Sequence, residues 1–303
     1  FKPPQYGTLL FYPLLEAFRD AFPKGVINTI YAPGAVVVPH MLATGKINVL
    51  ALIGSSKVAD HLKKQHPKSH RLRAILGLDA KNAAIILPDA DLDLTVKECL
   101  LGALSFNGQR CTALKMLIVH ESIVDAFLAR FTEALGKLKV GMPWEAGVNI
   151  TPLPGLHRTA YMTDANDDAK AKGACIVNQG GDTFRQTLFY PAVVYPVTEG
   201  MKLYREEQFG PLIPVTTFGD IETALEYVIT SDHGQQVSIF GSDPAQIGEL
   251  VDPLVNQVCR VNLNCQCQRG PDVFPFAGRK DSAEGTLSVT DALRAFSIRS
   301  MVA

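Results

Sequence analysis

The chain has 303 residues, of which 47% are hydrophobic and 19% charged, so it is long enough for a large core and for more than one domain. The formal net charge is -1 and no dense run of lysine or arginine occurs, which argues against a surface for nucleic acid or anionic membranes. No apolar stretch reaches membrane-spanning length and the first residues do not have the pattern of a secretory leader, so we expect a cytoplasmic protein.

Six cysteines are too few for a disulfide scaffold in a chain of this size, so we expect reduced thiols. Cys265 and Cys267 have no matching second pair, which argues against a zinc site, and we expect no metal. Three histidines, His61, His66 and His70, lie among lysines at a spacing that does not share one helical face. We therefore predict a solvated loop there.

The first part of the chain alternates helical and extended patterns. Apolar residues recur with helical spacing over 9–22, and the pattern over 26–34 predicts a strand and a turn. The apolar run over 47–56 predicts a buried parallel strand that ends in a glycine-serine turn, and a helix is predicted over 57–64. This alternation is typical of a doubly wound α/β fold.

The pattern continues along the rest of the chain. A strand is predicted over 83–87 and a helix over 92–104, with Asp91 and Asp93 at the N-terminus of the helix. We expect Ser122 to cap a later helix. The apolar face of that helix would carry Ile123, Phe127, Phe131, Leu135 and Leu138. Further strands are predicted over 116–120, 192–197, 212–218 and 237–240, with a helix over 221–230.

The stretch NGQRCTALK, over 107–115, places one cysteine in a polar turn after the helix predicted over 92–104. Gly108 is expected to end that helix. The donors and charge of Gln109 and Arg110 favour the thiolate of Cys111, the form that attacks carbonyl carbon. The alternative is a buried structural cysteine, which is common for free thiols. The four polar or glycine residues before Cys111 favour a nucleophile.

Five segments of the chain resemble, in order, motifs of the aldehyde dehydrogenase superfamily. NGQRCTALK resembles the nucleophile segment of that superfamily, REEQFGP its ribose-contacting segment and FPFAGRKDSAEG its late signature. IGSS and PDADLD also fall where the superfamily has its motifs. Within the superfamily, the resemblance is to the branch of NADP-dependent, non-phosphorylating glyceraldehyde-3-phosphate dehydrogenases.

The resemblance implies an aldehyde dehydrogenase-like α/β fold in three parts. Residues 1–75 would form part of a doubly wound nicotinamide-cofactor domain, 76–285 an α/β catalytic domain, and 286–303 an oligomerisation segment. Family members are longer at the N-terminus, so we expect the first nucleotide-binding strands and an asparagine that binds the oxyanion to lie outside this chain. The complete protein would be a homodimer or homotetramer.

The resemblance also implies oxidation of an aldehyde to a carboxylic acid. Cys111 would add to the carbonyl, and its backbone amide would donate to the resulting oxyanion. Gly77 stands where the family has a glutamate as general base. Asp79, two positions later on the same face of a strand, is the candidate base, although a capping or solvated role for it stays open. Glu207 and Glu98 are the next candidates.

The same motifs imply the cofactor contacts. Lys2 matches a lysine that contacts the adenosine ribose, and Gln5 stands near a glutamate of NAD-preferring members. A neutral glutamine tolerates a ribose phosphate that a carboxylate would repel, so we predict NADP, with NAD as the alternative. The other expected contacts are Gly54 and Ser56 at a phosphate turn, and Glu207 and Phe209 near the nicotinamide ribose and ring.

The expected substrate is a small polar aldehyde, most simply glyceraldehyde 3-phosphate. The segment over 261–272 is polar for a pocket, and Asn262 stands where many relatives have an aromatic residue. Arg110 and Arg269 are candidate phosphate contacts, because a guanidinium can bind phosphate with two hydrogen bonds. Pairing of Arg269 with Asp272 is the alternative.

Three other functions fit parts of the sequence. The chain could oxidise another small polar aldehyde or a semialdehyde. It could be a non-catalytic fragment or pseudoenzyme of the same fold, because the base position holds Gly77. A cysteine hydrolase that uses Cys111 and a histidine is the last alternative, but it leaves the cofactor motifs unexplained.

Overall fold

The computed structural model describes residues 1–303, apart from the side chain of Val289. The chain divides into two compact units. The first contains Phe1–Leu50 and Lys57–Arg73, and the second contains Ala51–Ser56 and Ala74–Ala303. No helix in the described part of the chain is both long and apolar enough to cross a membrane.

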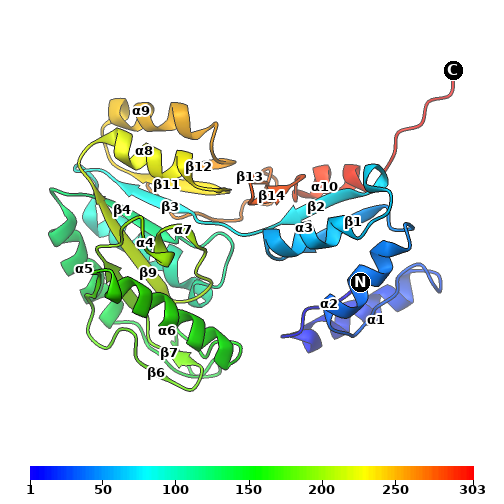
Figure 1. The fold of residues 1–303 in the computed structure, drawn as a ribbon, viewed down its shortest axis with the longest axis horizontal. Coiled ribbons are helices and arrows are strands. Elements are labelled where there is room, and N and C mark those ends of the chain that lie inside the picture. The colour runs from blue at the N-terminus through cyan, green and yellow to red at the C-terminus, as the bar shows by residue number, and fades with distance from the viewer. The chain divides into compact units, whose positions relative to one another are not determined.

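A seven-stranded sheet forms the centre of the second unit (Figure 1). Its strands are β3 (Ala83–Ile86), β4 (Met116–His120), β5 (Cys175–Ile176), β8 (Ala192–Tyr195), β9 (Leu212–Phe218), β11 (Gln236–Phe240) and β12 (Arg260–Leu263). Their order is β12-β11-β3-β4-β9-β8-β5, and only β5 runs antiparallel to its neighbour. All residues of β3 are buried, as expected for a parallel strand covered on both faces.

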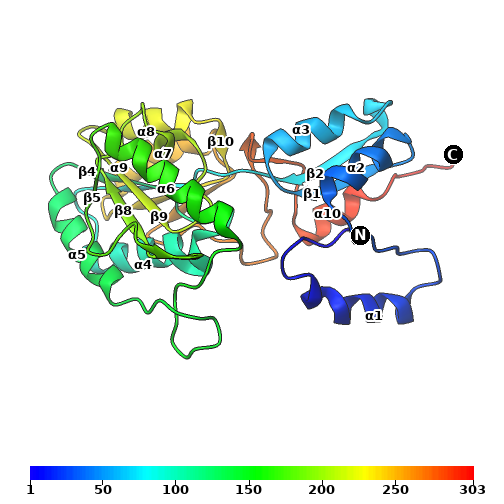
Figure 2. The same cartoon turned by 60° about the horizontal axis from the view of Figure 1, so that its bottom comes forward.

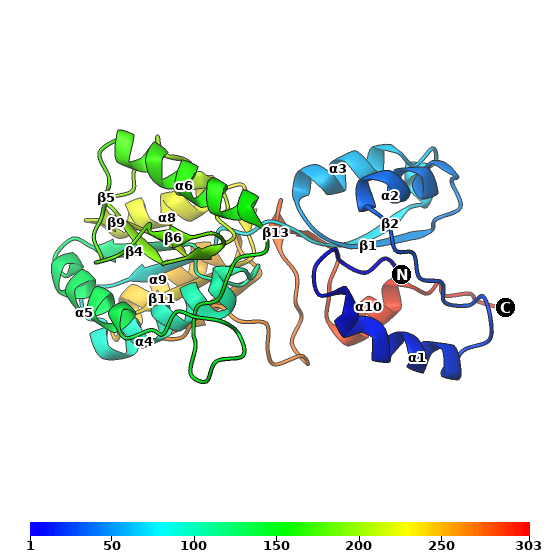
Figure 3. The same cartoon turned by 90° about the horizontal axis from the view of Figure 1, so that it is seen from below.

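Helices cover both faces of this sheet. They are α4 (Leu92–Leu104), α5 (Val124–Gly136), α6 (Leu156–Ala171), α7 (Lys202–Arg205), α8 (Ile221–Thr230) and α9 (Pro244–Leu254). Figure 3 shows α6 and α8 on one side, and α4 and α5 on the other. Because side chains alternate along a strand, Ile85 packs in the core beneath α6, α8 and α9, whereas Ile86 packs in the core beneath α4 and α5.

Smaller elements lie in both units. β2 (Arg73–Gly77) lies between β1 (Val49–Ile53) and β14 (Ala283–Glu284) in a three-stranded sheet. Two short antiparallel pairs are β6 (Phe184–Arg185) with β7 (Leu188–Phe189), and β10 (His233–Gly234) with β13 (Arg279–Lys280). The last helix is α10 (Val289–Ala295), and single 3-10 turns are η1 (Thr8–Phe11), η2 (Ser69–Arg71) and η3 (Ser105–Gly108).

The first unit contains α1 (Tyr12–Ala21), α2 (Gly34–Ala43) and most of α3 (Ser56–Lys64). Figure 2 shows α1 lying apart from α2 and α3. No residue of α1 is buried, although its apolar residues repeat with helical spacing. The pattern therefore identifies the helix but not a surface that covers it.

Most of the predicted elements are confirmed. The predicted strands over 116–120 and 212–218 and the predicted helix over 221–230 match β4, β9 and α8 residue for residue. Asp91 caps α4 as expected, since its carboxylate accepts hydrogen bonds from the amides of Asp93 at 3.0 Å and Leu94 at 3.1 Å. The α/β fold class predicted from the alternation is confirmed for the seven-stranded sheet.

The strand predicted over 26–34 is wrong. The segment has no regular strand structure up to Gly34, where α2 begins. Its amide at Ile30 donates to the carbonyl of Phe1 at 2.9 Å, but no ladder of bonds continues from there. Apolar, β-branched residues favour a strand only where a partner strand is available to pair with them.

Two smaller predictions are also wrong. The cap position of α5 is Ile123, and the hydroxyl of Ser122 instead lies 2.8 Å from Nδ1 of His120. His66 does not lie in a solvated loop, because it is buried with Nε2 3.0 Å from the carbonyl oxygen of Ile47. Ser122 contacts a neighbouring side chain instead of capping the helix, and His66 contacts a backbone carbonyl instead of solvent.

Candidate active site

The turn that carries Cys111 begins where α4 ends. Phe106, Asn107 and Gly108 all have positive φ, at 55°, 60° and 70°. A Cβ on Gly108 would lie 2.6 Å from the carbonyl oxygen of Gly210, so only glycine fits there. The buried side chain of Asn107 accepts from the amide of Thr151 at 2.9 Å, which stabilises this unusual backbone.

Asn82, directly before β3, fixes the backbone of the cysteine itself. Its Nδ2 donates to the carbonyl of Cys111 at 2.7 Å and to that of Ala113 at 3.1 Å. Its own carbonyl accepts from the amide of Lys115 at 2.8 Å. Cys111 is half-buried, so its thiol is held on a rigid loop that a small molecule can reach.

Arg110 braces the same turn. Its Nη1 donates to the hydroxyl of Ser105 at 2.6 Å, and its Nη2 donates to that of Thr112 at 2.8 Å. Its guanidinium also lies over the ring of Phe106, 5.8 Å from the centroid. Its Nε donates to the same hydroxyl of Thr112 at 3.2 Å, so three of the five N–H groups of Arg110 are engaged within the turn.

A buried ion pair lies behind the cysteine. Nζ of Lys115 is 3.3 Å from Oε1 of Glu207, and it donates to the carbonyl of Gln208 at 3.0 Å. The same carboxylate oxygen accepts from the amide of Ala80 at 3.1 Å. Burial lowers the pKa of Lys115 and raises the pKa of Glu207, and the opposite charge of each partner counteracts its shift. Nζ also lies 4.6 Å from the ring centroid of Phe209.

A second buried lysine supports the segment that carries Glu207. Nζ of Lys81 donates to the carbonyls of Leu203 and Glu206, both at 2.8 Å, and to Oε1 of Gln208 at 2.5 Å. Burial lowers the pKa of Lys81 well below its usual value. The sequence patterns gave neither buried lysine a role. A lysine inside an apolar segment was the available signal, because lysines are rarely buried unless they are paired.

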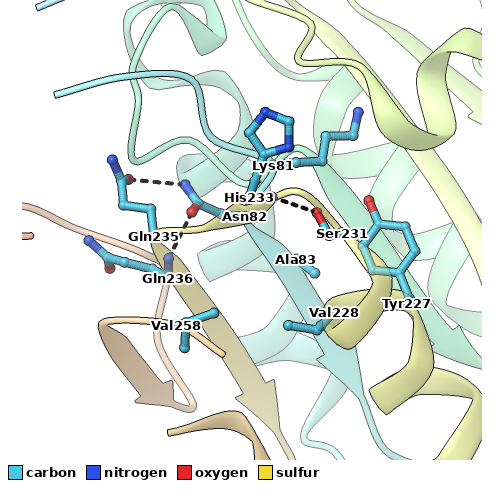
Figure 4. A pocket seen from close by; sticks show the side chains of 10 residues that line it. All are labelled: Lys81, Asn82, Ala83, Tyr227, Val228, Ser231, His233, Gln235, Gln236 and Val258. Carbon is cyan, nitrogen blue, oxygen red and sulfur yellow. Dashed lines mark hydrogen bonds between the residues drawn. The ribbon is translucent and has the colours of Figure 1, made fainter. Parts of the chain in front are cut away.

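A small cavity next to Lys81 is drawn in Figure 4. It has a volume of about 10 Å³, enough for a single water molecule. Polar groups on its wall include Ser231, His233 and Gln235. Burial lowers the pKa of His233 below its usual value, and the charge of Lys81 adds to this effect.

At Gly77, where the family has a glutamate, the side chain of Leu287 from the segment between β14 and α10 takes the adjacent space. A Cβ on Gly77 would lie 3.1 Å from Cδ1 of Leu287. Asp79 is half-buried, and its Oδ2 accepts from the amide of Ser56 at 2.7 Å and from the hydroxyl of Ser56 at 2.8 Å. Glu98, a further candidate base, accepts from the amide of Gln266 at 3.1 Å.

The expected phosphate turn lies beside Gly77. The amide of Gly54 donates to the carbonyl of Gly77 at 3.0 Å, which aligns the ends of β1 and β2. In the first unit, Nζ of Lys2 donates to the carbonyl of Pro3 at 2.7 Å, and Gln5 is exposed. The cofactor roles of Lys2, Gln5, Gly54 and Ser56 therefore stay proposals.

The two remaining predicted substrate residues have different surroundings. Asn262 is buried, and its Nδ2 donates to the carbonyl of Val237 at 3.1 Å. Arg269 pairs with Asp272 at 3.4 Å and donates to the carbonyl of Leu287 at 3.2 Å. Its guanidinium also stacks on the ring of Phe276, 4.5 Å from the centroid. Arg269 is therefore held beside Leu287, whose side chain packs on Gly77.

Comparison with known proteins places this arrangement in a family. The sequence profile of the aldehyde dehydrogenase family matches residues 1–302. NADP-dependent glyceraldehyde-3-phosphate dehydrogenase from Streptococcus equinus is 36% identical over 297 residues, which are 97% of this chain and 60% of that relative. Malonate-semialdehyde dehydrogenase from Lacticaseibacillus casei is 30% identical over 294 residues, which are 94% of this chain and 58% of that relative.

A solved structure gives the same result. The NADP-dependent glyceraldehyde-3-phosphate dehydrogenase from Bacillus halodurans C-125, complexed with NADP, matches with a TM-score of 0.91 at 32% identity. The match covers 97% of this chain and 60% of that chain. The chain thus spans about 60% of the length of the relatives that it matches. Because the profile extends over almost every residue, this chain belongs to the aldehyde dehydrogenase family.

Proposed function

We propose that this chain carries the nucleophile and part of the cofactor site of an NADP-dependent aldehyde dehydrogenase that oxidises glyceraldehyde 3-phosphate to 3-phosphoglycerate. The observation that carries the proposal is the half-buried thiol of Cys111 on a loop fixed by Asn82. The site belongs to a cytoplasmic, homo-oligomeric enzyme, in which residues 286–303 form the oligomerisation segment. Residues 1–75 belong to the cofactor domain and 76–285 to the catalytic domain.

The first step is addition of the Cys111 thiolate to the aldehyde carbon. The new carbon-sulfur bond places a negative charge on the former carbonyl oxygen, and the amide of Cys111 can donate to it. Asn82 keeps that amide in place because it holds the carbonyl of the same residue at 2.7 Å. A fixed donor stabilises the charge without reorganisation.

The cofactor supplies the acceptor for the hydride that leaves this adduct. The donors on this chain fit the diphosphate of a dinucleotide, because the amide and hydroxyl of Ser56 already bind one anion, the carboxylate of Asp79. Gly54 has no side chain to keep a phosphate away, and the atoms nearest to a Cβ there would be those of the Leu52 side chain. NADP is favoured by the neutral Gln5 and by the names of the relatives, and NAD is the alternative.

Hydrolysis of the resulting thioester needs a base that takes a proton from water. Asp79 is the proposed base, because Gly77 offers no carboxylate and Glu207 is engaged with Lys115. Hydrolysis breaks the bond between the acyl carbon and sulfur, returns the proton to Cys111 and releases the acid. Asp79 must leave Ser56 to take this role.

The substrate proposal depends on two guanidinium groups, that of Arg110 in the turn that carries Cys111 and that of Arg269 beside Leu287. Arg110 is bound to Ser105 and Thr112, and Arg269 lies against Leu287 next to Gly77. Both are suited to bind the phosphate of a three-carbon aldehyde. Oxidation of a semialdehyde is the second candidate, favoured by the 30% identity to malonate-semialdehyde dehydrogenase.

The proposal is tested by following NADPH formation by the purified protein in buffer without inorganic phosphate. We expect activity with glyceraldehyde 3-phosphate that Cys111→Ser abolishes. A parallel assay with malonate semialdehyde separates the two substrate classes by kcat/KM. Undiminished activity in Cys111→Ser would reject the mechanism, and a higher kcat/KM for malonate semialdehyde would reject the substrate.

A further inference from the structure

The contact between Asp79 and Ser56 joins residues 23 positions apart in the sequence. One carboxylate oxygen, Oδ2 of Asp79, accepts both the amide of Ser56 at 2.7 Å and its hydroxyl at 2.8 Å. Ser56 is the first residue of α3, which is nine residues long. The carboxylate therefore binds donors at a helix N-terminus, where free amides and the helix dipole favour an anion.

The local backbone explains how the carboxylate comes to lie there. The amide of Gly54 donates to the carbonyl of Gly77 at 3.0 Å, so the strand ends that precede Ser56 and Asp79 are paired. Each residue lies two positions beyond its member of that pair, so Asp79 and the N-terminus of α3 lie close enough for the contact. The contact is a direct consequence of having an aspartate at position 79.

We propose that the carboxylate of Asp79 is an internal competitor for the dinucleotide, which occupies the donors of Ser56 until a cofactor phosphate displaces it. This inference rests on the proposed function, in which those donors receive the diphosphate. A carboxylate and a phosphate cannot accept the same two hydrogens, and their charges repel at this distance. Asp79 therefore sets the affinity for the cofactor, and cofactor binding frees Asp79.

Nearby charged groups would stabilise the carboxylate of Asp79 after it has left Ser56. The charge of Asp79 partly offsets the burial that lowers the pKa of Lys115 and of His233, and it adds to the burial that raises the pKa of Glu207. A carboxylate that leaves Ser56 thus stays near one buried ammonium group. Cofactor phosphate then replaces the carboxylate at the donors of Ser56, and neither anion is left without a partner.

The test compares Asp79→Asn with the unchanged protein by calorimetric titration of NADP in the absence of substrate. The neutral amide still fits the space but binds the donors more weakly and does not repel phosphate. If Asp79 occupies Ser56 in about nine of ten cofactor-free molecules, the variant binds NADP about tenfold more tightly. Asp60→Asn is the matched control, because it removes the same charge from an exposed position of α3 and should leave the dissociation constant unchanged.

A second ligand identifies the part of the cofactor that competes. Adenosine 2′-phosphate lacks the diphosphate, so we expect its affinity to be the same in both proteins. If Asp79→Asn does not fold, as judged by circular dichroism, Asp79→Ala replaces it in the same titrations. Equal or weaker NADP binding by the Asp79 variant overturns the competition and leaves the proposed function intact. Absence of NADP binding by every protein, the unchanged one included, overturns both.

Discussion

Two turns of the second unit each contain a cysteine and an arginine, but they differ in how exposed the cysteine is. The nucleophile turn, 107–112, contains Cys111 after an arginine, and a second turn, 265–270, contains Cys267 shortly before one. Cys111 is half-buried, whereas Cys267 is fully buried with its Sγ 3.3 Å from Oγ of Ser238. Burial raises the pKa of Cys267 to about 12.

The difference shows that polar neighbours in the sequence do not decide whether a cysteine can react. Cys267 has polar residues on both sides, as Cys111 has before it. It is nevertheless enclosed, because it packs in the core beneath α4 and α5 with Cys99. Access to the thiolate is the property that separates a nucleophile from a structural thiol.

The largest expected effect is the loss of activity when Cys111 is replaced by serine, with the same change at Cys267 as the control. Cys111→Ser should lower kcat/KM for the aldehyde at least about a thousandfold, because a serine hydroxyl is a far weaker nucleophile. Cys267→Ser should have a kcat/KM within about threefold of that of the unchanged protein, because the buried side chain of Cys267 contacts no reactant. Steady-state NADPH formation measures both, and comparable losses in the two variants would contradict the distinction between the turns.

The next effect tests how the nucleophile turn is anchored. Lys115→Met removes the cation from a buried pair and leaves Glu207 without its partner, so unfolding should become easier by about 3–5 kcal/mol. Urea unfolding at pH 7 measures this loss. The double variant Lys115→Met with Glu207→Gln removes both charges and should recover part of the stability. A loss below about 1 kcal/mol in Lys115→Met would show that the pair contributes little.

Replacing Arg269 in the second turn should have a smaller effect, and this effect should be on substrate binding. Arg269→Ala should raise KM for glyceraldehyde 3-phosphate by about tenfold to a hundredfold, which corresponds to loss of a charge-assisted contact. KM for unphosphorylated glyceraldehyde should change little, and this substrate is the internal control. Equal increases for both aldehydes would assign Arg269 to packing against Phe276 and Leu287 instead.

The sequence predicted the framework of this molecule better than its site. Periodicity located β4, β9 and α8, because a buried strand or an amphipathic helix must repeat its apolar residues at a fixed interval. The family motifs located the cysteine turn. Lys81 and Lys115 were not found, since their roles depend on carbonyls and carboxylates more than 90 residues away. The hydrogen bond that Ser56 donates to Asp79 also joins residues that are far apart in the sequence.

The smallest effect tests the burial of Cys267 through the pH dependence of stability. The unfolded thiol has a pKa near 9.0, whereas burial raises the pKa to about 12 in the folded protein. Between these values the unfolded chain loses a proton that the folded chain keeps, so stability falls as pH rises, by at most about 1.4 kcal/mol per pH unit. Cys267→Ser cannot lose that proton. Its urea-unfolding free energy should therefore fall less steeply between pH 8.5 and pH 10, by about 1 kcal/mol in total. Identical slopes would mean that solvent reaches Cys267, and its turn would then be as open as that of Cys111.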